Sequence, residues 1–172
     1  MCYADGVRTT PGSTSRSSVA NSVLLRIAFW VGIIGFVLSL ATHIAALTGY
    51  PIPDAALGLH VGVFVAFVPV IFGLKAWVEE RGYDFNDFRG QWAGLRELLG
   101  GTPGWEKLCL GALFVYAMVN FLVGFAAVVG APDAGFSYRL FSGHWLFFYF
   151  ISAVFARRLL VLRQQVAPPR EV

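Results

Sequence analysis

The chain has 172 residues, of which 57% are hydrophobic and only 13% are charged. An ordinary soluble domain has about 25% charged residues, so this composition excludes that class and places the chain in a lipid bilayer. The net charge of +3 does not indicate a nucleic-acid partner, because the Lys and Arg residues are scattered between apolar stretches.

The chain order predicts one membrane domain between two polar tails. Residues 1–22 are rich in Ser, Thr, Gly and Arg, which is typical of a disordered tail. Four apolar stretches follow, each long enough as a helix to cross a hydrocarbon core of roughly 30 Å. We therefore expect one four-helix transmembrane domain over 23–163, with a short tail over 164–172. The expected spans cover 27–48, 55–77, 108–129 and 140–156.

The basic residues predict the orientation. Of the 13 Lys and Arg residues, all but Arg139 lie before the first span, after the fourth span, or in the segment from Lys75 to Lys107 between the second and third spans. The positive-inside rule then places both termini and that segment in the cytoplasm, as in a bacterial-type inner membrane. The other two connections are short, at 49–54 and 130–135, which predicts an up-down antiparallel four-helix bundle.

The segment 84–99 between the second and third spans has a helical pattern of its own. Phe85, Phe88, Trp92, Leu95 and Leu99 recur at three- and four-residue steps among charged residues. This pattern predicts an amphipathic helix in the cytoplasmic interface of the membrane. Such a helix either rests passively in the interface or contacts a partner protein.

Small and polar residues indicate which faces of the spans lie inside the bundle. In the first span, Gly32, Gly35, Ser39 and His43 form one stripe, and small residues let helices approach closely within lipid. Asn120, at the middle of the third span, would be costly in lipid. We expect it to make a structural hydrogen bond to a neighbouring helix.

The chain has three histidines, and each lies in a different span near the same outer face. His43 is close to the end of the first span, while His60 and His144 are close to the starts of the second and fourth. Neutral imidazole is the commonest metal ligand in proteins, and ionisable residues within a span indicate function. Two of these histidines would serve as axial ligands of a haem b, and all three would make a Zn or Cu site.

The surroundings of the histidines favour haem slightly over a bare metal. Glycines next to His60 and His144 leave room for a macrocycle. Arg139, with Tyr138, lies about one turn from His144 and has the chemistry to pair with a haem propionate. The alternative is that Arg139 only anchors the chain at the interface.

Two functions stay open. The first is a membrane electron-transfer protein with a haem b or metal, and with a quinone or a membrane redox protein as partner. The second is a non-catalytic membrane subunit or scaffold, as a homo- or hetero-oligomer, whose histidines are structural. A small-solute transporter is less favoured, because no Asp or Glu lies within any expected span.

Overall fold

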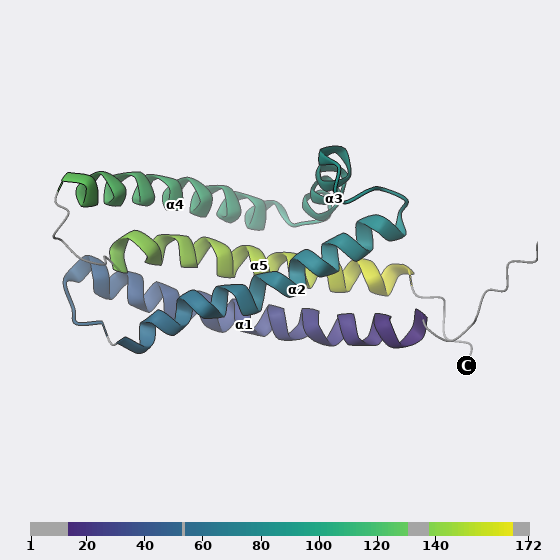
Figure 1. The fold of residues 1–172 in the computed structure, drawn as a ribbon, viewed down its shortest axis with the longest axis horizontal. Coiled ribbons are helices and arrows are strands. Elements are labelled where there is room, and N and C mark those ends of the chain that lie inside the picture. Colours follow the sequence, from purple (N-terminus) through teal and green to yellow (C-terminus); the bar gives the residue numbers. More distant parts are fainter. Residues whose placement is uncertain (1–13, 53, 131–137, 167–172) are drawn as a thin grey trace, which may run out of the picture.

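The computed structural model describes residues 14–52, 54–130 and 138–166, and the elements in these ranges are all helical. Within them, four helices are long and apolar enough to cross a membrane. A shorter helix, α3, lies between the second and third of these (Figure 1). The elements are α1 (Thr14–Thr48), the 3-10 helix η1 (Asp54–Leu57), α2 (Gly58–Glu80), α3 (Phe88–Gly100), α4 (Gly104–Gly130) and α5 (Tyr138–Val166).

Helix α5 is the centre of the bundle. It packs against α1, α2 and α4, whereas α4 packs almost entirely against α5. In the most apolar stretch of α5, 56% of the residues are buried inside the protein, compared with 11% in α4. The bundle is therefore a core of α1, α2 and α5 with α4 attached to one side. Consecutive spans run in opposite directions along the long axis of Figure 1.

Several helices are longer than the apolar stretches that predict them. Helix α1 begins at Thr14, so residues 14–22, interpreted as part of a disordered tail, are helical. Helix α5 continues through Arg157 and Arg158 to Val166. Once a span has nucleated a helix, each further residue adds a backbone hydrogen bond, so a charged residue does not end it.

The predicted inner face of α1 is confirmed. Gly32, Gly35, Ser39 and His43 are all buried. A methyl group added at Gly32 would press on Ala153 of α5, and one added at Gly35 would overlap the ring of Tyr149. The small residues thus permit close contact between α1 and α5, as expected for helices in lipid.

Helix α3 begins at Phe88, later than the predicted 84, because residues 84–87 form a turn in which the backbone N–H of Asp87 donates to the carbonyl oxygen of Asp84. It runs across the long axis of the bundle, near the end where α2 and α5 finish (Figure 1). Its buried Gly94 fits against Val78 of α2, and Leu98 belongs to the hydrophobic core.

Candidate functional site

A hydrogen-bond cluster centred on a buried histidine lies at the end of the bundle where α1 ends and α5 begins, which we call the histidine end. His43 of α1, Tyr116 of α4 and Ser142 of α5 form what we name the His43 cluster. The Nδ1 atom of His43 lies 2.6 Å from Oγ of Ser142, and its Nε2 atom is hydrogen-bonded to the hydroxyl of Tyr116. His43 is only 4% exposed. One side chain therefore joins three of the spanning helices.

The partners of His43 suggest where its proton lies. A neutral imidazole has one N–H donor and one acceptor nitrogen. A phenol is a stronger acid than an aliphatic hydroxyl, so we assign Tyr116 as the donor to Nε2 and Nδ1–H as the donor to Ser142. Both ring nitrogens are then engaged. A metal ion could bind His43 only by displacing one of these hydrogen bonds.

His60 of α2 has different neighbours and is exposed. Its Nδ1 atom accepts a hydrogen bond of 3.3 Å from Nε1 of the buried Trp145 on α5. The rings of Phe64, Phe141 and Trp145 surround the imidazole edge to face, with centroids about 6 Å away. Because Nδ1 is an acceptor, the proton of a neutral His60 lies on Nε2.

His144 of α5 faces α4. Its ring meets Phe121 edge to face, with 5.1 Å between the ring centroids. The neighbouring Gly143 packs against the side chain of Asn120, so closely that an added methyl group would lie 2.8 Å from the amide nitrogen. Asn120 thus lies in the contact between α4 and α5.

The three histidines do not come together. Within the described residues no group of three or more His, Cys, Asp or Glu side chains is arranged to hold a metal ion. Helix geometry explains this result: Ser142 faces His43, and two residues further along the helix rotate His144 by about 200° toward α4. Haem ligation by two histidines stays a prediction.

The remaining candidate residues are Tyr138 and Arg139 at the start of α5 and Ser39 in α1. The side chains of Tyr138 and Arg139 lie outside the described part of the structure, so their predicted contact with a cofactor stays a prediction. The hydroxyl of Ser39 is fully buried and makes no hydrogen bond within the described residues.

Tyr149 is the most tightly enclosed aromatic residue of this half of the bundle. Its ring lies against Gly35 of α1, and its hydroxyl lies against Gly62 of α2. That hydroxyl donates a 2.7 Å hydrogen bond to the carbonyl oxygen of Leu59. Tyr149 therefore fixes the spacing of three helices below the histidines.

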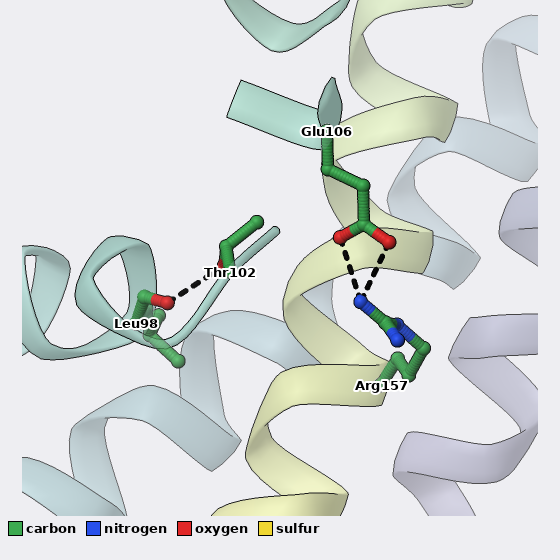
Figure 2. A network of polar contacts seen from close by, with 4 residues as sticks. All are labelled: Leu98, Thr102, Glu106 and Arg157. Atoms are coloured by element: carbon green, nitrogen blue, oxygen red, sulfur yellow. Dashed lines mark hydrogen bonds and ion pairs between the residues drawn. The ribbon is translucent and has the colours of Figure 1, made fainter. Parts of the chain in front are cut away.

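An ion pair joins α4 to α5 at the opposite end of the bundle, which we call the arginine end. Nη2 of Arg157 lies 2.6 and 2.7 Å from the two carboxylate oxygens of Glu106 (Figure 2). Glu106 is buried, whereas 43% of the Arg157 side chain is exposed. The hydroxyl of Thr102 closes the turn before α4 by donating to the Leu98 carbonyl (Figure 2).

The sequence prediction missed this ion pair. It drew the third span from Leu108, but α4 begins at Gly104, and the membrane-length stretch includes Glu106. The helix that contains the third predicted span therefore also contains an acidic residue, Glu106, two positions before that span begins. The sequence did contain a signal for this ion pair: Arg157 directly follows the fourth predicted span, where a cation next to apolar residues is stabilised by a nearby carboxylate.

The same prediction singled out His43 but not Tyr116 or Ser142, its two hydrogen-bond partners. Comparison with known proteins adds no further residue, because no family model, curated protein or solved structure matches the chain.

Proposed function

We propose that the chain is a multi-pass protein of a bacterial-type inner membrane, with both termini and α3 on the cytoplasmic side. The four long apolar helices support the membrane location. The orientation rests on the cations, which gather at the arginine end: Arg157, Arg158 and Arg163 lie in the last part of α5, while Arg139 is near its start.

Cysteine labelling tests this orientation. In a chain lacking its native cysteines, Tyr50→Cys places a thiol at the histidine end and Asn86→Cys places one at the arginine end; both positions are exposed. A maleimide that cannot cross membranes is expected to label position 50 but not position 86 in intact spheroplasts. The reverse pattern overturns the orientation.

Within that membrane, we propose a non-catalytic subunit or scaffold whose histidines are structural. The observation that carries this proposal is the bonding of His43: Ser142 and Tyr116 engage both of its nitrogens from two other helices. The exposed apolar surfaces of α2 and α4 fit contact with lipid, a second copy or a partner subunit.

Binding of haem b, Zn or Cu through two or three of His43, His60 and His144, with electron transfer to a quinone or a redox protein, stays a prediction from the sequence. Visible spectra of the purified protein in mild detergent, oxidised and reduced, together with metal analysis, separate the two functions. We expect no haem bands and no stoichiometric metal. Haem bands or one equivalent of metal, lost in His60→Ala or His144→Ala, would falsify the structural role.

A further inference from the structure

Helix α3 has three distinct faces, and only one of them packs firmly on the bundle. Gly90, Gly94 and Leu98 are buried, and Gly94 lies against Val78 of α2. At 100° per residue these positions span about 80° of the helix surface. The remaining surface of α3 contains an apolar face and a basic face.

The apolar face changes character along its length. Phe88, Trp92, Leu95 and Leu99 share it, within about 60° of one another. Leu95 and Leu99 pack against the hydrophobic core. Phe88 and Trp92 are 74% and 57% exposed, and their rings stack with centroids 6.4 Å apart. The first half of the face therefore extends beyond the edge of the bundle.

The basic face borders this aromatic pair. Arg89 and Arg96 are both exposed and lie about 80–100° around the helix from Phe88. Within the described residues neither of them forms an ion pair. The acidic Glu97 lies further round, and its carboxylate is 3.3 Å from Arg81. Unpaired cations thus flank an exposed apolar pair.

We propose that this surface of α3, formed by Phe88, Arg89, Trp92 and Arg96, binds anionic phospholipid in the leaflet at the arginine end. The aromatic rings enter the boundary between headgroups and acyl chains, and the two guanidinium groups contact the lipid phosphates. The proposal rests on the membrane location given under the proposed function. It adds a preference for anionic over zwitterionic lipid.

The neighbouring surface favours lipid over a protein partner. Helix α3 lies across the direction of the spans, as a helix in the membrane plane does (Figure 1). Helix α4 begins directly after it and exposes Trp105 and Leu108, 62% and 74%. Aromatic residues concentrate at membrane interfaces in this way. The same lipid layer that covers the first turns of α4 would cover Phe88 and Trp92.

The test compares two double variants of the full chain, with lipid retention measured by native mass spectrometry from equal mixtures of phosphatidylglycerol and phosphatidylcholine. Arg89→Gln with Arg96→Gln removes the proposed contacts. Lys75→Gln with Arg81→Gln removes the same charge from two cations already held by Glu79 and Glu97. The first pair should lower the preference for phosphatidylglycerol about 25-fold, because each arginine is expected to contribute roughly fivefold. The second should change it little.

An equal loss in both variants overturns the proposal, because net charge would then explain the preference. A second measurement follows the fluorescence of Trp92 in vesicles. The Trp92 signal is obtained as the difference in fluorescence between the wild type and Trp92→Phe. Phospholipid brominated near the headgroup is expected to quench it, and aqueous iodide is not. Quenching by iodide alone overturns the proposal and leaves the face open to a protein partner. Failure of the chain to enter vesicles at all would instead contradict the membrane location.

Discussion

The two ends of the bundle hold their helices together with different chemistry. At the histidine end the links are hydrogen bonds that involve no carboxylate: the buried His43 and Ser142 with the partly exposed Tyr116, and the buried Trp145 with the exposed His60. At the arginine end the links are ion pairs whose cations keep contact with the surroundings, since about two-fifths of the Arg157 side chain is exposed.

The difference follows from the cost of burying charge. A neutral hydrogen bond can be enclosed between helices at little cost, whereas a buried ion pair must offset the desolvation of both ions. A long Arg side chain near a helix end lowers this cost by keeping its charged head near water. Substitutions at the histidine end should therefore act through packing and lost partners, and those at the arginine end through charge.

The largest effect is expected from Gly35→Ala in the packing below the histidine end. The added methyl group would overlap the Tyr149 ring, which cannot retreat because its hydroxyl is held against Gly62 and bonded to Leu59. Overpacking of this kind costs about 3 kcal/mol. An SDS titration in mixed micelles measures the free energy of unfolding.

Gly111→Ala is the matched control for this substitution. It makes the same change in α4, where an added methyl group meets nothing within 4 Å. No loss of stability is expected there. If both variants lose the same free energy, the contact with Tyr149 is not the cause, since alanine has a higher helix propensity than glycine and would not itself lower stability.

The next largest effect is expected from His43→Ala. The substitution removes two hydrogen bonds and leaves Tyr116 and Ser142 without this partner. Hydrogen bonds between membrane helices contribute about 0.6–1.7 kcal/mol each, so we expect a loss of about 2 kcal/mol. The same titration measures it.

His60→Ala provides the comparison, because this exposed residue accepts one longer bond from Trp145. The His60→Ala variant should lose about 0.5 kcal/mol of the free energy of unfolding. Equal losses in the two histidine variants would show that burial does not distinguish them. The structural role proposed for His43 would then lose its basis.

A smaller effect is expected from Glu106→Gln at the arginine end. The substitution removes the charge but keeps the shape, and the half-exposed Arg157 can turn to water, so the loss should be about 1 kcal/mol. Raising the salt concentration should shrink the difference from the wild type. A loss that does not change with salt contradicts an electrostatic role.

Lys75→Gln is the control for the charge effect. Lys75 and Glu79 are 3.7 Å apart, and both side chains are nearly half exposed. Removing an exposed pair of this kind costs about 0–0.5 kcal/mol.

The sequence could predict the spans and the inner face of α1 because both are local patterns. An apolar stretch shows its own length, and Gly32, Gly35, Ser39 and His43 repeat at helical spacing whatever surrounds them. The existence of an amphipathic helix between the second and third spans is local in the same way.

The contacts of the histidines could not be predicted in this way. Depth in the membrane follows from the chain order, but the direction of a side chain depends on how each helix is rotated about its axis. His43 and Tyr116 are 73 positions apart, and no local pattern joins them. Because the three histidines lie at equal depth, the sequence suggested that they form one cluster. In the structure, the rotation of α5 about its axis instead turns Ser142 toward α1 and His144 toward α4.

The last substitution, Ser39→Ala, is expected to raise stability, in contrast to the losses expected at His43 and Glu106. Its hydroxyl lies on the same face of α1 as His43, fully buried, yet it makes no hydrogen bond within the described residues. A buried hydroxyl without a partner costs free energy, so removing it should raise the free energy of unfolding, by up to about 1 kcal/mol. Together with His43→Ala, this substitution separates two meanings of a buried polar residue: one that binds helices together, and one whose small size alone suits a close contact. A loss of stability in Ser39→Ala, measured by the same titration, would show that the hydroxyl has a partner and belongs with the His43 cluster.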